Sequence, residues 1–159
     1  MRPSPDVRFA IPCACVAARR AARAVTQLYD RHLKASGLEA TQFALLSVMH
    51  ELGPSSQVSI GQAFALDKTT LSRNVKLMHR RGWIAAATAD DRRERRYALT
   101  PAGNERLAAA RPHWKRAQQG LRASMSAAEW TAMWNAFALV TAAADATARQ
   151  RPVQRRKSE

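Results

Sequence analysis

Apolar residues recur at the three-to-four spacing of amphipathic α-helices along most of the chain. A first helix is expected from Cys13 to a stop at Gly37, with an apolar stripe formed by Val25, Leu28, His32 and Leu33. The segment TQFALLSVMHEL predicts a second helix capped by Thr41 and ended by Gly53. The segment IGQAFAL predicts a short third helix capped by Ser59.

The periodicity changes after a fourth helix, which is expected to be capped by Asp67 and ended by Gly82. Its buried face is predicted to consist of Leu71, Val75 and Met78. The segments WIAAAT and RYALT then have the composition of short strands, and the polar run ADDRRERR separates them. These segments predict a β-hairpin with a charged tip.

Two further helices complete the pattern. Thr100 followed by Pro101 predicts the start of a long fifth helix, and Ser126 with Glu129 forms a capping box for a sixth. The apolar stripe of the sixth helix consists of Trp130, Met133, Trp134, Phe137, Val140 and Thr141. The predicted fold is mainly α with a small β-hairpin wing: a winged helix-turn-helix with N- and C-terminal dimerisation helices.

Length and composition fit one globular domain between two tails. The chain has 159 residues, of which 47% are hydrophobic and 24% charged. Residues 1–12 contain three prolines and are expected to form a flexible arm, and residues 149–159 a basic tail. The sequence has no apolar run long enough to span a membrane and no secretory apolar stretch near its start, so we expect a cytoplasmic location and no membrane partner.

The net charge of +14, from 26 Lys and Arg against 12 Asp and Glu, favours an anionic partner. Nucleic acid is the commonest partner of so basic a domain. A coding bias towards arginine and alanine would explain why arginine replaces lysine, but it would not explain the shortage of acidic residues. We therefore expect double-stranded DNA to be the partner.

The fourth helix carries the residue types of a DNA-recognition helix. Its predicted solvent face holds Lys68, Thr69, Thr70, Arg73 and Lys76. Threonine reaches phosphates or thymine methyl groups, arginine binds a guanine edge through two hydrogen bonds, and lysine suits a phosphate. The alternative is an ordinary amphipathic helix with a basic solvated face.

The hairpin tip favours the DNA-binding interpretation. Arg92, Arg93 and Arg95 are candidates for insertion into a narrow minor groove, where the negative potential is enhanced. Asp91 is expected to orient one of these arginines through a salt bridge.

The segment DKTTLSRNVKLMHRRGWI followed by DDRRERRYALTPAG resembles the MarR family of bacterial transcription regulators. The resemblance rests on Asp91-Arg92-Arg93 and on the Leu-Thr-x-x-Gly run from Leu99 to Gly103, and it covers roughly residues 13–148. It implies a DNA-binding part at about 41–100 and dimerisation parts at about 13–36 and 101–148. It also implies an obligate homodimer whose two winged helices read a pseudo-palindrome.

MarR-like proteins usually release DNA when a small phenolic or carboxylic ligand, or an oxidant, acts on them. Cys15 resembles, by its position, the reactive cysteine of the organic-peroxide-sensing branch, and Tyr29 resembles one tyrosine of that branch. Cys13 and Cys15 are therefore candidate redox sensors. The alternatives are two small buried cysteines or, more weakly, metal ligands; we expect no metal and no cofactor.

These patterns predict a sequence-specific transcriptional regulator, a homodimeric repressor that a small-molecule effector or thiol oxidation releases from its operator. One alternative is a nonspecific, nucleoid-type DNA-binding protein. Another is a thiol peroxidase, which would need a nearby base and a resolving cysteine. The chain is not expected to be an enzyme, because it has no Gly-rich phosphate loop, nucleophile elbow or HExxH motif.

Overall fold

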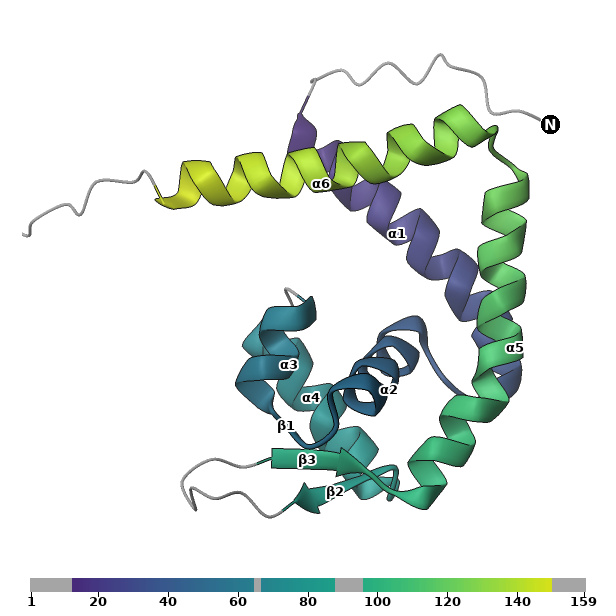
Figure 1. The fold of residues 1–159 in the computed structure, drawn as a ribbon, viewed down its shortest axis with the longest axis vertical. Helices are drawn as coiled ribbons and strands as arrows, with labels where there is room; N and C mark the ends of the chain where they lie inside the picture. Colours follow the sequence, from purple (N-terminus) through teal and green to yellow (C-terminus); the bar gives the residue numbers. More distant parts are fainter. Residues whose placement is uncertain (1–12, 65–66, 88–95, 150–159) are drawn as a thin grey trace, which may run out of the picture. The chain divides into compact units, whose positions relative to one another are not determined.

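The computed structural model of the chain describes residues 13–64, 67–87 and 96–149 (Figure 1). The predicted arm at residues 1–12, the hairpin tip at residues 88–95 and the tail from residue 150 lie outside the described residues.

Helices dominate the described chain, and three short strands interrupt them. The elements in chain order are α1 (Ala14–Leu33), the 3-10 turn η1 (Lys34–Ser36), α2 (Ala40–Leu52), β1 (Ser55–Ser56), α3 (Gln57–Phe64), α4 (Lys68–Arg80), β2 (Ile84–Ala87), β3 (Arg96–Leu99), α5 (Pro101–Ala123) and α6 (Ala127–Arg149). This order confirms the predicted winged helix-turn-helix, with α3 and α4 followed by the hairpin.

The chain divides into two compact units, Met1–Gln118 and Gln119–Glu159, and α5 crosses the boundary between them. The first unit contains every described element from α1 to β3 together with most of α5. The second contains the end of α5 and the whole of α6.

Two of the predicted helix caps are wrong by two or three residues. Helix α2 begins at Ala40 rather than after Thr41, because Glu39 and Gln42 form a reciprocal capping box. Ser59 lies inside α3, and its backbone N–H donates to the Ser56 hydroxyl at 3.2 Å. In both places an earlier polar side chain takes the unpaired N–H groups of the first turn.

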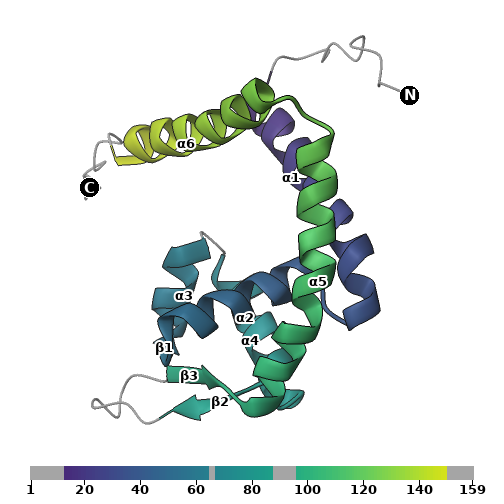
Figure 2. The same ribbon diagram turned by 45° about the vertical axis from the view of Figure 1, so that its right-hand side comes forward.

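The sheet has three strands rather than the two of the predicted hairpin. Strand β3 lies between β1 and β2, and both pairings are antiparallel (Figures 1 and 2). Ser55 pairs with Tyr97, while Ile84 pairs with Leu99. A strand of two residues has no periodicity for a sequence to show, which is why β1 was not predicted.

The core of the first unit lies among α1, α2, α3, α4, α5 and the sheet. Its fully buried side chains are Leu33, Leu45, Leu46, Met49, Ile60, Val75, Met78, Ile84 and Leu107. The Phe43 and Trp114 rings stack with centroids 5.8 Å apart and join α2 to α5. The predicted buried face of the fourth helix is confirmed, because Leu71, Val75 and Met78 are all buried.

The second unit is a helix with an exposed apolar side. The predicted capping box is confirmed, since the Ser126 N–H donates to the Glu129 carboxylate at 2.8 Å and the Glu129 N–H donates to the Ser126 hydroxyl at 3.2 Å. The Arg122 guanidinium lies 5.6 Å from the centre of the Trp130 ring. Over its described length α6 buries no residue, and Trp134 is 53% exposed. None of the helices described in either unit is both long and apolar enough to cross a membrane.

Candidate nucleic-acid interface

Helix α4 begins at a well-formed cap. The Asp67 carboxylate accepts a hydrogen bond from the Thr70 N–H at 2.9 Å, and the Asn74 amide donates to the Thr70 carbonyl oxygen at 2.9 Å. Hydrogen bonds from the side chain and then the backbone of Thr70 lower the pKa of Asp67 below its ordinary value. The predicted cap is therefore confirmed, and it holds the first turn of α4 in place.

One side of α4 faces the core, and the other side bounds a shallow surface depression, here called the α4 hollow. Its lining residues are Lys68, Thr69, Ser72, Arg73 and Lys76. Four of the five predicted contact residues of this helix thus come together. The fifth, Thr70, is half-buried and does not line the hollow. Ser72 was missed, although its spacing of three from Thr69 and four from Lys68 places it on their face.

A second depression lies beside the C-terminal half of α4, against the sheet, and is here called the α4–β3 hollow. Its lining residues are Arg73, Val75, Lys76, His79, Arg80 and Tyr97. The rings of His79 and Tyr97 meet edge to face, with centroids 6.1 Å apart and planes at 78°. The predicted DNA contacts of α4 stopped at Lys76. Arg80 lies four residues after Lys76 and seven after Arg73, and this helical spacing places it on the same face.

The turn after α4 is tied to the start of α5. Gly82 has a φ of 70°, a left-handed conformation that glycine adopts without strain. The Thr100 hydroxyl donates to the Gly82 carbonyl oxygen at 2.6 Å, and the Thr100 N–H donates to the Trp83 carbonyl oxygen at 3.0 Å. Thr100 also accepts a hydrogen bond from the Gly103 N–H at 3.1 Å. One threonine therefore joins the end of the candidate recognition helix to α5.

Trp83 lies at the centre of this connection. Its side chain is only 6% exposed, and the guanidinium groups of Arg81 and Arg106 lie 4.9 Å and 5.4 Å from its ring centre. Arg106 also donates to the Ser36 carbonyl oxygen at 2.9 Å. The side chain of Arg106 thus links α5, the 3-10 turn η1 and the turn after α4.

The candidate wing residues Asp91, Arg92, Arg93 and Arg95 lie outside the described residues. The strands on either side of the tip are described, and Ala87 pairs with Arg96 where the tip leaves the sheet.

The candidate redox residues lie on or just before α1, and within one chain Tyr29 lies far from the two cysteines. Cys13 is half-buried just before the helix, and Cys15 is exposed in its first turn. Tyr29 is 14 residues further along, so about 21 Å of helix separates it from Cys15. Its hydroxyl donates to the Gln118 side chain, and burial raises the pKa of Tyr29. Among the residues that the structure describes, no group of three or more His, Cys, Asp or Glu side chains could hold a metal ion.

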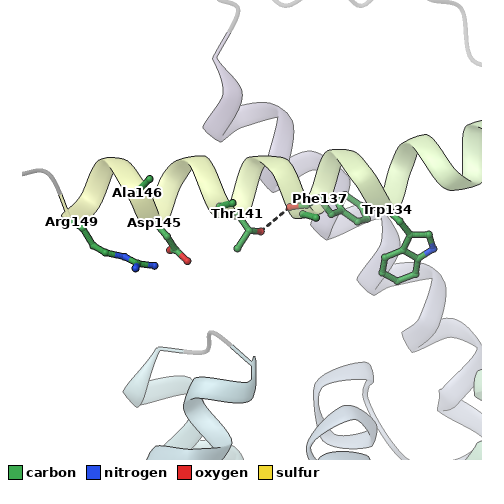
Figure 3. Close-up of a pocket in the computed structure, with 8 residues that line it drawn as sticks. Trp134, Phe137, Thr141, Asp145, Ala146 and Arg149 are labelled. Atoms are coloured by element: carbon green, nitrogen blue, oxygen red, sulfur yellow. Dashed lines mark hydrogen bonds between the residues drawn. The ribbon is translucent and has the colours of Figure 1, made fainter.

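An open groove runs along one side of α6 (Figure 3). Its lining residues are Trp134, Phe137, Ala138, Thr141, Ala142, Asp145, Ala146 and Arg149. The Thr141 hydroxyl donates back to the Phe137 carbonyl oxygen at 2.8 Å, so this polar side chain is paired within its own helix.

The sequence pattern of the MarR family matches residues 36–94, a stretch that starts at the last residue of η1 and includes α2, α3, α4 and β2. The transcriptional regulator MosR of M. tuberculosis, solved in complex with DNA, is 36% identical to this chain. The alignment covers 85% of this chain and 98% of MosR, with a TM-score of 0.76. The chain belongs to the MarR family.

Two other relatives agree with this assignment. A probable transcriptional regulator from Pseudomonas aeruginosa is 26% identical, with 81% of this chain and 97% of that protein covered and a TM-score of 0.73. The uncharacterized HTH-type transcriptional regulator YwoH of Bacillus subtilis is 26% identical over 81 residues. That match spans 51% of this MarR-family chain and 59% of YwoH. The family and these relatives are transcriptional regulators rather than enzymes.

Proposed function

We propose that this MarR-family protein is a sequence-specific DNA-binding transcriptional regulator, and that α4 is its recognition helix. The observation that carries the proposal is the two-sided character of α4. Leu71, Val75 and Met78 bury one side, while the lysines, arginine and hydroxyls of the α4 hollow occupy the other. No carboxylate lines that hollow among the described residues. The complex of the 36% identical MosR with DNA supports the same function.

The residues of the α4 hollow divide by chemistry. Arg73 offers a planar fork that suits the two acceptors of a guanine edge, whereas Lys68 and Lys76 suit phosphates as point charges. The hydroxyls of Thr69 and Ser72 suit either bases or phosphates. The positive end of the α4 dipole adds attraction for a phosphate close to Lys68.

The wing has a separate part in the proposal. Arg92, Arg93 and Arg95 would enter the minor groove beside the half-site that α4 reads, with Asp91 orienting one of them. The antiparallel pair of β2 and β3 supports this assignment, because it carries both ends of the tip.

The protein is proposed to act as a homodimer through the second unit. Trp134, Phe137 and Val140 of α6 are 53%, 45% and 54% exposed in the single chain. Covering a large apolar side chain contributes about 1.5–3 kcal/mol of favourable free energy, so a second copy that covered these three side chains would stabilise a dimer substantially. A two-fold dimer would then place its two α4 helices in successive major grooves, about 34 Å apart.

The protein is proposed to repress while it is bound to its operator, and to be released from the operator by a small phenolic or carboxylic acid or by thiol oxidation. The exposure of Cys15 supports the second route, because an organic hydroperoxide can reach it. The peroxide would be reduced to an alcohol as the thiol becomes a sulfenic acid. A second thiol would then displace water and form a disulfide.

Binding of the full chain to promoter DNA beside its own coding region, against random DNA at one stated salt concentration, tests the function. A regulator is expected to prefer the promoter site by a factor of roughly 10³ or more, whereas a nucleoid-type protein of net charge +14 would bind both alike. Arg73→Ala is expected to weaken operator binding by about 1–3 kcal/mol and to relax selectivity. Arg111→Ala on α5 removes the same charge and is the matched control.

The release routes need a second comparison on the same operator. The protein is measured in reduced form, after a mild organic hydroperoxide, and with added small aromatic acids. Loss of binding on oxidation that Cys15→Ser prevents supports the thiol route, with Cys13→Ser showing whether the second thiol takes part. Binding that oxidant leaves untouched, but that an aromatic acid abolishes, assigns release to the ligand.

A further inference from the structure

The α4–β3 hollow extends beyond the α4 hollow, with which it shares Arg73 and Lys76. Its cationic side chains are Arg73, Lys76 and Arg80, spaced so that they share one side of α4. Val75 is buried, and no carboxylate lines the hollow among the described residues. The hollow therefore has the charge of an anion site, with an apolar side chain as part of its wall.

Tyr97 forms the opposite side of this hollow on a well-supported strand. It pairs with Ser55 of β1 and with Ala86 of β2, so both neighbours hold the backbone of β3 in place. Its ring is half-buried and meets the His79 ring edge to face. Tyr97, whose phenol hydroxyl can donate a hydrogen bond, thus lines the same hollow as the three cations.

We propose that the α4–β3 hollow binds a phosphodiester group of the DNA backbone. Arg80 and Lys76 would supply the charge, and the Tyr97 hydroxyl would supply a hydrogen bond. A guanidinium fork binds two phosphate oxygens at once, and a tyrosine hydroxyl is a common partner of backbone phosphates. The inference rests on the proposed DNA-binding function and names a contact that positions the protein without reading sequence.

The place of the hollow in the fold favours a backbone phosphate over a base. Base edges are read from the N-terminal half of a recognition helix, and the α4 hollow lies there. Tyr97 is the second residue of β3, the strand that follows the wing tip in the chain, and it lines the hollow together with residues of α4. Arg73 and Lys76 line both hollows and make them continuous. In this proposal, a DNA strand whose major groove is read by the N-terminal half of α4 would present its backbone to the α4–β3 hollow.

The test measures affinity of the full chain for its operator and for random DNA across a range of salt concentrations. Arg80→Ala is expected to weaken both complexes by roughly 5- to 20-fold and to reduce the salt slope by about 1. Tyr97→Phe keeps the ring contact with His79 and removes only the hydroxyl. It is expected to weaken both complexes by roughly 2- to 10-fold without changing the salt slope. Arg111→Ala is the charge-matched control, and light scattering checks that it keeps the mass of the parent because Arg111 lies in the proposed dimerisation part. Thermal unfolding confirms that each variant is folded.

Three results would overturn the assignment. If Arg80→Ala has no larger effect than Arg111→Ala, and Tyr97→Phe binds like the parent, the hollow holds no phosphate. In that case, a loss of operator binding in Arg73→Ala would still support the proposed function. If Arg80→Ala weakens the operator complex alone, Arg80 reads a base. If the parent protein itself shows no preference for its operator, the proposed function fails, and the inference fails with it.

Discussion

Replacing Gly103 by alanine tests the connection between α4 and α5. A Cβ atom at this position would lie 2.0 Å from the Trp83 carbonyl oxygen and 2.9 Å from its carbonyl carbon. Ordinary contact begins near 3.4 Å, so the two backbone segments would have to separate by about 1.4 Å. Both partners are backbone atoms, so a change of rotamer does not relieve the contact.

The expected loss of stability comes from the bonds that such a movement breaks. The hydrogen bonds from the Thr100 N–H to Trp83 at 3.0 Å and from the Gly103 N–H to Thr100 at 3.1 Å are both expected to be lost. Each contributes about 1 kcal/mol, and strain from overpacking adds about 1–3 kcal/mol. Alanine regains about 1 kcal/mol through its higher helix propensity. The net destabilisation is therefore expected to be about 2–4 kcal/mol.

Thermal unfolding at a fixed protein concentration is the assay, and Tm is expected to fall by roughly 5–15 °C. Gly120→Ala in the same helix is the matched control, because a Cβ there has none of the described atoms within 4 Å. That variant is expected to gain up to about 1 kcal/mol, with its mass checked by light scattering because Gly120 lies in the proposed dimerisation part. A Gly103→Ala protein as stable as the Gly120→Ala protein would refute the reasoning.

Three further results are expected. Asp67→Ala should lower Tm at neutral pH. Because hydrogen bonds lower the pKa of Asp67 in the folded state, the difference in Tm from the parent should close only as the pH falls through that lowered pKa, and a difference that persists in stronger acid would contradict the cap. Tyr29→Phe should lower the free energy of unfolding by about 1 kcal/mol at neutral pH, because the variant lacks the hydrogen bond to Gln118. Since burial raises the pKa of Tyr29 above 10.0, the parent alone should lose that part of its stability above pH 10, as chemical denaturation at each pH would show. Trp134→Glu should convert a dimer into a monomer in light scattering, whereas Val58→Glu, at an exposed position of α3, should not; unchanged mass in Trp134→Glu would exclude α6 from the interface.

Much of the fold follows from local patterns in the sequence. The buried face of α4, its cap at Asp67 and the capping box at Ser126 could be predicted because each depends on residues within one or two turns. The solvent face of α4 was predicted from the same spacing, and Lys68, Thr69, Arg73 and Lys76 do line one hollow.

The sequence does not decide which of several neighbouring polar residues caps a helix. Thr41 and Ser59 have the right chemistry for a cap, yet Glu39 and Ser56 come first along the chain and take that role. Where several polar residues precede a helix, the path of the preceding segment selects among them, and that path depends on tertiary packing.

The sequence by itself determined the helices, the hairpin and the basic face of α4, because hydrophobic spacing and caps act over a few residues. Only the tertiary structure brought Tyr97 to His79, Thr100 to Gly82 and Arg106 to Trp83. Each of these pairs joins residues 18 or more positions apart, on different elements, and no local period relates them. These contacts form because of the way in which the helices pack around the shared core, and the same packing determines where the α4–β3 hollow lies.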